Sequence, residues 1–190
     1  MTECLHIDGG TPLMGTLKAA GNKNAVLPMM AAALLTDETV VLENVPDIGD
    51  VHTMAEILSG LGADVAWNPA AHRLAIHAVE VNPDGLSFEL CRRIRASILL
   101  AAPIMLRAGR SAIATPGGDI IGRRRLESHL VGLRQLGARV EGEDPIRFAA
   151  DGLLHGGDVF LPEASVTGTE QLLTAAAQAR GTTVIHNAAC

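Results

Sequence analysis

The residues best suited to chemistry lie in one short stretch, where a glycine-rich turn carries a single acid and leads into three arginines. The stretch reads Pro116-Gly117-Gly118-Asp119-Ile120-Ile121-Gly122-Arg123-Arg124-Arg125. Glycines let backbone amides come close to a ligand, and guanidinium groups bind phosphate and carboxylate through paired donors. An acid beside such an anion trap can carry a proton for a charged substrate. The stretch therefore predicts a reaction site, with Asp119 as the acid.

The distribution of charge around this stretch favours a compact anionic ligand. The net charge is -6, yet eleven of the fifteen Lys and Arg lie between Arg92 and Arg147 with only five acids, so this segment is +6 and the rest -12. Tyrosine is absent and aromatic residues make up 2% of the chain, which leaves no stacking platform for single-stranded nucleic acid. We expect a small anion and no nucleic acid. The alternative is that most of these arginines belong to solvated helix faces.

Composition narrows the setting of the protein. The 190 residues suit one large domain, and no uninterrupted apolar run reaches the length of a membrane span. The first residues lack the basic start and apolar core of a signal peptide. The three cysteines (Cys4, Cys91 and Cys190) have no metal-binding spacing, and their odd number argues against a disulfide framework. We expect a cytoplasmic protein with no metal, no cofactor and no membrane partner.

The elements that must position these residues recur along the chain. In the first copy, a helix over 24–35 precedes a strand over 39–44, a helix over 50–59 and two short strands near Val65 and 74–77. The second copy places a helix over 95–106, a strand over 111–114 and a helix over 124–135, followed by strands over 145–149 and 158–161. Leu-Gly-Ala ends the last helix of both copies, at Gly62 and, 75 residues later, at Gly137. The chain is therefore a structural repeat.

A third copy begins with a helix over 169–179 and a strand over 182–187, in which Asn187 matches Asn44 of the first copy. By the spacing of the first copy, a further helix and a third Leu-Gly-Ala should follow, so the sequence looks cut inside a repeat. The alternative is a natural C-terminus with a shortened last unit.

Several motifs, in order along the chain, resemble those of one family, the UDP-N-acetylglucosamine enolpyruvyl transferases (1-carboxyvinyltransferases). Gly21-Asn22-Lys23-Asn24-Ala25-Val26-Leu27-Pro28 is similar to the family's Gly-x-Lys-Asn-Ala-x-Leu-Pro signature. The resemblance covers essentially the whole chain but only about the first half of a normal member. It is carried further by Asn44-Val45-Pro46 with Asp50-Val51, Arg95-Ala96-Ser97, Pro116-Gly117-Gly118 and Ser165-Val166-Thr167-Gly168-Thr169-Glu170.

The resemblance implies a fold and a reaction. The expected fold is one lobe of an inside-out α/β barrel built from βαβαββ units, with residues 21–190 as the lobe, incomplete at its C-terminal end. Residues 1–20 would form strands that normally belong to the other lobe. The implied reaction transfers the enolpyruvyl group of phosphoenolpyruvate to the 3-hydroxyl of UDP-N-acetylglucosamine, the first committed step of peptidoglycan synthesis. A complementary C-terminal half, or self-association through exposed repeat edges, is the expected partner.

The resemblance also assigns roles to residues. Asp119 replaces the family's more usual cysteine and would protonate the methylene carbon of phosphoenolpyruvate, although nearby arginines favour its charged form unless closure of the site excludes water. Lys23 would contact phosphoenolpyruvate and the reacting centre, with Asn24 either beside it or capping the helix. Arg123 and Arg125 depart from the family pattern, and His129 either contacts substrate or packs. The nucleotide sugar would be contacted by Arg95, Arg124, Arg125, Leu126, Glu127, Ser128, Glu163, Ala164, Ser165 and Val166.

Three other interpretations remain open. A shikimate-type enolpyruvyl transferase shares the architecture but generally has serine where this chain has Asn24. A non-catalytic lobe or subunit that binds a nucleotide sugar would keep the motifs without turnover. An RNA-binding module using the arginines is the third, and it would show a steep salt dependence without selectivity for uridine nucleotides.

Overall fold

Two sheets with the same topology dominate the computed structural model, which describes residues 4–118 and 125–189. The first sheet has the order β1-β3-β2 and the second the order β4-β6-β5, and every pairing in both is antiparallel. In each sheet the last strand in the chain takes the central place, which confirms the predicted repeat. The strands are β1 (Val40–Leu42), β2 (Asp64–Asn68), β3 (Arg73–His77), β4 (Arg110–Ile113), β5 (Arg139–Glu141) and β6 (Ile146–Ala149).

The helices follow the predicted order with small shifts in their ends. The third unit contains α6 between β7 (Asp158–Phe160) and β8 (Val184–His186), and these two strands pair in parallel. The strand expected over 158–161 in the second copy therefore belongs to the third unit. Short 3-10 helices η2 (Pro69–Ala71) and η3 (Pro83–Gly85) lie within connections. The remaining helical elements are α1 (Lys23–Ala32) with η1 (Ala33–Leu35), α2 (Gly49–Gly60), α3 (Phe88–Cys91), η4 (Arg95–Leu100) leading into α4 (Ala101–Ala108), α5 (Glu127–Gln135) and α6 (Val166–Ala176).

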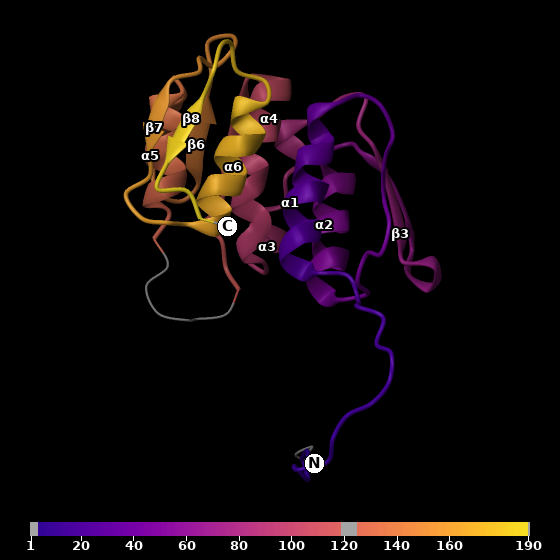
Figure 1. Ribbon diagram of the computed structural model, residues 1–190. Coiled ribbons are helices and arrows are strands. Elements are labelled where there is room, and N and C mark those ends of the chain that lie inside the picture. Colours follow the sequence, from indigo (N-terminus) through magenta and orange to yellow (C-terminus); the bar gives the residue numbers. More distant parts are fainter. Residues whose placement is uncertain (1–3, 119–124, 190) are drawn as a thin grey trace.

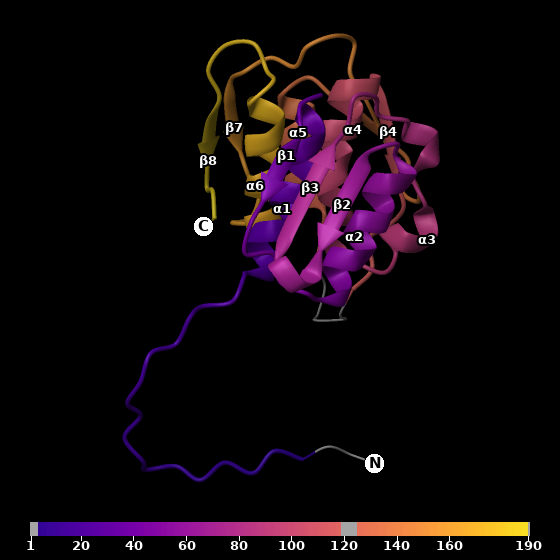
Figure 2. The ribbon, with the colours of Figure 1, turned by 90° about the vertical axis from the view of Figure 1, so that its right-hand side faces the viewer.

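Helices fill the interior and the sheets lie outside them, as the inside-out arrangement requires. In Figure 1, α1, α4 and α6 stand between β3 on one side and β6, β7 and β8 on the other. Figure 2 shows β1, β3 and β2 spread in front of α1 and α2. The inward side chains of the strands, such as Leu74, Ile76 and Phe148, are almost fully buried against this helical layer. The predicted fold class is therefore confirmed.

Backbone conformation repeats together with topology. Gly62 and Gly137 each follow a helix end with positive φ, 96° and 100°, the left-handed conformation that glycine adopts most easily at a helix C-terminus. Asn44 and Asn187 are two of three non-glycine residues with positive φ in the described ranges, at 55° and 58°. Equivalent residues therefore make equivalent turns in the first and third units.

One arginine joins the first unit to the second. Arg107, near the end of α4, donates hydrogen bonds to the carbonyl oxygens of Leu34 (2.8 Å), Ala78 (2.9 Å) and Val79 (2.8 Å). Helix η1 and the end of β3 leave these carbonyls without strand or helix partners, and one guanidinium group can satisfy all three. Helix α4, which continues past the predicted end at 106, thus also fastens the two units together through Arg107.

Two helices begin elsewhere than the sequence predicted. Helix α6 begins at Val166, three residues before the predicted start, because the hydroxyl of Ser165 accepts a hydrogen bond from the amide of Gly168 at 3.1 Å and caps it. Helix α5 begins at Glu127, three residues after the predicted start. Helix α3 was not predicted; Ser87 caps it in the same way.

The N-terminal segment lies apart from the units. Residues 4–20 form no helix or strand and are exposed throughout, and both views show the chain running away from the body. Leu5, Ile7, Leu13, Met14 and Leu17 are each at least 86% exposed. Pairing of residues 1–20 with another lobe stays a prediction. In the described ranges, no helix combines the length and apolar character needed to span a membrane.

Candidate active site

The first predicted site residues meet in a cavity of about 370 Å³ beside the start of α1, here called the Lys23 cavity. Helices α1, α2 and α6 and the 3-10 helix η4 all contribute to its wall. Leu27, Pro28 and Leu99 supply apolar surface, and Gly118 brings the glycine-rich turn to its rim. The polar side chains in the wall are Lys23, Asn24, Asp50, Arg95, Thr167 and Glu170.

Asn22, and not Asn24, caps α1. The side-chain oxygen of Asn22 accepts hydrogen bonds from the backbone amides of Asn24 (2.7 Å) and Ala25 (3.1 Å). Asn24 is therefore not needed as the cap, and it lines the cavity. Lys23 forms an ion pair with Asp50 in the first turn of α2, with 2.6 Å between Nζ and Oδ2. The pair holds the ammonium group at a helix N-terminus, where anions are favoured.

A second cavity of about 320 Å³, here called the Arg125 cavity, adjoins the first. The two share Arg95, Val166 and Thr167 in their walls. Arg95 also donates a hydrogen bond to the carbonyl oxygen of Arg125 at 3.3 Å. The other residues of the Arg125 cavity are Arg125, Glu163, Ala164 and Ser165. The structure thus gathers predicted residues from four separate segments around Arg95.

Three predicted residues near the start of α5 lie outside both cavity walls. Ser128 is fully buried, and its hydroxyl donates to the carbonyl oxygen of Glu163 at 3.1 Å. It braces the loop before α6 and does not face either cavity. Leu126 is half-buried just before α5, and Glu127 is exposed as its first residue. Contacts of Leu126 and Glu127 with a nucleotide sugar stay predictions.

His129 packs behind the site. It is 1% exposed; its Nε2 lies 3.0 Å from the hydroxyl of Thr167, and its Nδ1 is hydrogen-bonded to the side chain of Gln171. Burial lowers the pKa of His129 to about 4; the bond to Gln171 opposes this shift and the charge of Arg95 adds to it. The ring is therefore neutral near neutral pH. Of the two roles left open by the sequence, packing is the one that the geometry supports.

The glycines of the glycine-rich turn allow it to pack closely against another segment of the chain. A Cβ at Gly117 would lie 1.5 Å from the carbonyl oxygen of Arg92, and Gly118, with φ of 90°, lies against the backbone of Arg95. Only glycine permits this contact at Gly117. The sequence predicts that these glycines let the backbone come close to a ligand. In the structure they also let the turn pack against the backbone of Arg92 and Arg95.

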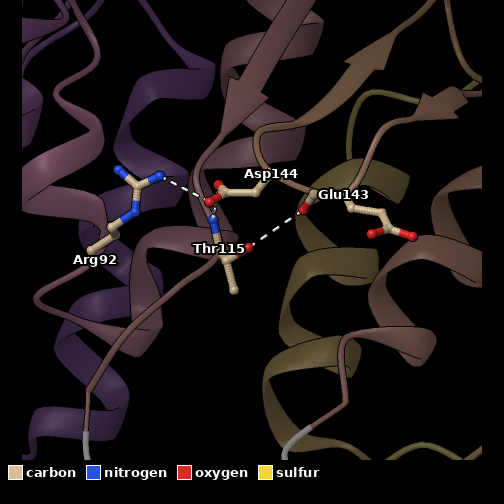
Figure 3. A network of polar contacts seen from close by, with 4 residues as sticks. All are labelled: Arg92, Thr115, Glu143 and Asp144. Carbon is tan, nitrogen blue, oxygen red and sulfur yellow. Dashed lines mark hydrogen bonds and ion pairs between the residues drawn. The ribbon is translucent and has the colours of Figure 1, made fainter.

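A polar network anchors the chain just before the turn (Figure 3). The carboxylate of Asp144 accepts hydrogen bonds from the amide of Thr115 (3.0 Å) and from the guanidinium of Arg92 (2.9 Å). The Thr115 hydroxyl also donates to the carbonyl oxygen of Glu143 at 3.4 Å. The amide of Thr115, followed by Arg92, lowers the pKa of Asp144. Arg92 is exposed at the surface and its pair with Asp144 helps to hold the base of the turn, whereas Arg93 forms a surface pair with Glu89.

Asp119, Arg123 and Arg124 lie outside the described residues. Their predicted roles, the proton donor and the diphosphate contact above all, are not addressed by the geometry. The residues on either side of 119–124 are described. Gly118 lines the Lys23 cavity and Arg125 lines the Arg125 cavity.

A third cavity, of about 350 Å³, lies on the outer face of the second sheet and contains none of the predicted residues. Arg110 and Arg139 line it, but each already pairs with an exposed carboxylate, Asp84 and Asp151 respectively. Because this cavity contains none of the residues of the recognised motifs, the two cavities around Arg95 are the better candidate site.

Comparison with known proteins identifies the family. The model of a family described as EPSP synthase (3-phosphoshikimate 1-carboxyvinyltransferase) matches residues 7–190. The chain belongs to this enolpyruvyl transferase family. Curated relatives carry the name UDP-N-acetylglucosamine 1-carboxyvinyltransferase: that of Bradyrhizobium diazoefficiens is 50% identical over 96% of this chain, and that of Treponema denticola 46% identical over 96%. In both cases the chain spans 42% of the relative's length.

Solved structures agree on the fold of this enolpyruvyl transferase chain. The enolpyruvyl transferase NikO from Streptomyces tendae matches with a TM-score of 0.76 and 21% identity, over 93% of this chain and 41% of that one. An EPSP synthase from Acinetobacter baumannii matches with a TM-score of 0.68 and 20% identity, over 90% and 40%. At such identities the likeness concerns the fold alone.

Sequence reasoning missed three polar residues in the Lys23 cavity. Asp50 stood in a recognised motif, but its pairing with Lys23 depends on how α2 packs against α1. Thr167 and Glu170 also belonged to a motif, and the structure places both on α6 in the cavity wall. The spacing of 167 and 170, three residues apart on one helix, was the signal that could have joined them.

Proposed function

We propose that this chain supplies one lobe of a UDP-N-acetylglucosamine 1-carboxyvinyltransferase, which moves the enolpyruvyl group of phosphoenolpyruvate to the 3-hydroxyl of the sugar and releases phosphate. The observation that carries the proposal is the meeting of two adjoining cavities at Arg95, one led by Lys23 and the other by Arg125 and Ser165. A substrate pair made of a small anion and a nucleotide sugar needs two such neighbouring sites. The cytoplasmic setting and the role in peptidoglycan synthesis belong to the same proposal.

The Lys23 cavity suits the smaller anion. Lys23 offers a point charge at the N-terminus of α1, and Arg95 offers a planar set of donors opposite it. Asp50 orients the ammonium group without leaving the cavity wall. In the proposed reaction a proton from Asp119 adds to the methylene carbon of phosphoenolpyruvate, and the sugar hydroxyl attacks the adjacent carbon while its own proton passes to a base. Departure of phosphate and loss of a proton from the methyl group then restore the double bond.

The Arg125 cavity suits the nucleotide part. The side chain of Arg125 is exposed at its wall, and Ser165 lies at the N-terminus of α6, where free amides and the helix dipole favour phosphate. Leu126, Glu127, Arg124, Glu163, Ala164 and Val166 complete the proposed contacts with the nucleotide sugar.

A shikimate-type activity fits less well. Asn24 lines the Lys23 cavity where that type generally has serine, and the curated relatives at 46–50% identity carry the UDP-N-acetylglucosamine name. A non-catalytic lobe that binds a nucleotide sugar is the second candidate. The two cavities around Arg95 would serve it equally, because they account for binding and not for turnover. Partnership with a complementary half, or self-association, is part of both proposals.

Binding and turnover of the 190-residue chain test the proposal together. We expect calorimetry to detect UDP-N-acetylglucosamine binding, and replacement of Arg95 by alanine to weaken it at least about tenfold, equivalent to about 1.4 kcal/mol. Arg93→Ala is the matched control, since Arg93 lies two residues away and pairs with Glu89 on the surface. We expect no substantial phosphate release from the chain alone. Normal turnover by the chain alone would contradict the partial-lobe proposal, and equal binding by both variants would contradict the site.

A further inference from the structure

Glu170 lines the Lys23 cavity and has no role in the proposed reaction. It lies on α6, half-buried, in the wall that also carries Lys23 and Arg95. The other cavity carboxylate, Asp50, is paired with Lys23. For Glu170 the described part of the chain provides no ion pair, and burial raises the pKa of its carboxyl. The residue therefore bears a desolvation cost that no cation in the wall is shown to offset.

Stability of the helix does not account for this glutamate. Acids are favoured in the first turn of a helix, where the dipole and free amides attract negative charge. Glu170 is the fifth residue of α6, beyond that turn, and Ser165 already caps the helix. A half-buried acid without a partner is ordinarily disfavoured at such a position. Since no described residue is shown to pair with this carboxylate, a ligand group is the partner that we consider.

The chemistry of a carboxylate restricts what that ligand group can be. An ionised carboxylate only accepts hydrogen bonds, and it repels the phosphate or carboxylate groups that Lys23 and Arg95 attract. A neutral group rich in donors satisfies it, such as a sugar hydroxyl or an amide N–H. In a cavity beside a nucleotide site, the sugar of a nucleotide sugar is such a group.

We propose that Glu170 is a specificity-determining residue, which accepts a hydrogen bond from the sugar of the nucleotide sugar and keeps anions away from that end of the Lys23 cavity. The inference rests on the proposed function, which it deepens. Lys23 and Arg95 hold the anion, and Glu170 on the α6 wall marks the place of the neutral sugar. One cavity can then receive two unlike substrates without exchanging their positions.

Opposite changes in the binding of two ligands test this role. Calorimetry would compare Glu170→Ala and Glu170→Gln with Glu56→Gln, a control at an exposed position on α2 away from both cavities. In Glu170→Ala we expect about tenfold weaker binding of UDP-N-acetylglucosamine and unchanged binding of UDP, which lacks the sugar. We expect both Glu170 variants to bind phosphoenolpyruvate several-fold more tightly. Glu170→Gln keeps an acceptor oxygen, so its affinity for UDP-N-acetylglucosamine should fall less than that of Glu170→Ala.

The outcomes separate this inference from the proposed function. If the unaltered chain binds neither UDP nor UDP-N-acetylglucosamine, the proposed function fails and the role of Glu170 fails with it. If the unaltered chain binds them and the Glu170 variants match it, the inference alone is overturned. Equal weakening of UDP and UDP-N-acetylglucosamine, or weaker binding of phosphoenolpyruvate, would indicate a structural role and would also overturn it.

Discussion

Acidification should destabilise the protein through one side chain, His129, and replacing that side chain should remove the effect. The ring is buried between α5 and α6, and hydrogen bonds to Thr167 and Gln171 occupy both of its nitrogens. Protonation would place a charge in this interior, near Arg95. It would also remove the ring nitrogen that acts as acceptor in one of the two hydrogen bonds. The folded protein therefore resists a proton that the unfolded chain accepts freely.

The size of the effect follows from the pKa of His129 in the two states. It is about 4 in the folded protein, against 6.5 for an unperturbed histidine. As the pH falls, the unfolded state binds the proton before the folded state does. The contribution of neutral His129 to stability is therefore complete above about pH 6.5 and is lost as the pH falls toward 4. Between about pH 7.5 and about pH 5 the linkage relation gives a loss of about 2 kcal/mol.

Urea unfolding followed by circular dichroism at the two pH values measures this loss. Other groups titrate in the same range, so the informative quantity is the difference between the unaltered protein and His129→Gln, which cannot titrate. The glutamine variant should be less stable at pH 7.5, by about 1–3 kcal/mol, because hydrogen bonds and packing are lost. That gap should shrink by about 2 kcal/mol at pH 5. A gap that stays constant with pH would refute the reasoning.

Two further substitutions test how the units and the turn are held. Arg107→Ala should lower the free energy of unfolding by about 2–4 kcal/mol, because three carbonyl oxygens lose a charged donor. The control Arg93→Ala, which removes an exposed ion pair, should lower it by less than about 1 kcal/mol. Equal losses in the two variants would contradict the bridging role of Arg107. Gly117→Ala should lower the thermal midpoint by about 3–10 °C through its clash with the Arg92 carbonyl, whereas Gly157→Ala, in open space, should change it little; a harmless Gly117→Ala would contradict the close approach.

Local patterns in the sequence were enough to predict the repeat and most of its elements. Apolar periodicity and the two Leu-Gly-Ala helix ends depend on neighbouring residues, and the structure confirms them at Gly62 and Gly137. The start of α6 was missed by three residues. The first turn of α6 contains Gly168, a weak helix former, so only the capping bond reveals that the helix already begins at Val166.

Partners between distant elements could not be predicted in the same way. Nothing in the local sequence shows that Asp50 pairs with Lys23, because the contact arises only when α2 packs beside α1. The inward turn of His129 likewise depends on α6 lying against α5. Motifs brought the right segments into the candidate site, while the roles of individual side chains within it required the packed structure.

Arg95 links the ligand cavities to the segment that carries Asp119. Gly118, at one end of that segment, lies against the backbone of Arg95, and the carbonyl oxygen of Arg125, at the other end, accepts a hydrogen bond from its guanidinium group. The same side chain lines both the Lys23 cavity and the Arg125 cavity. An anion that draws the guanidinium group toward either cavity therefore competes with its bond to Arg125. Ligand binding at the proposed site and the bond between Arg95 and Arg125 would thus depend on one side chain, and we expect Arg95→Ala to impair both at once.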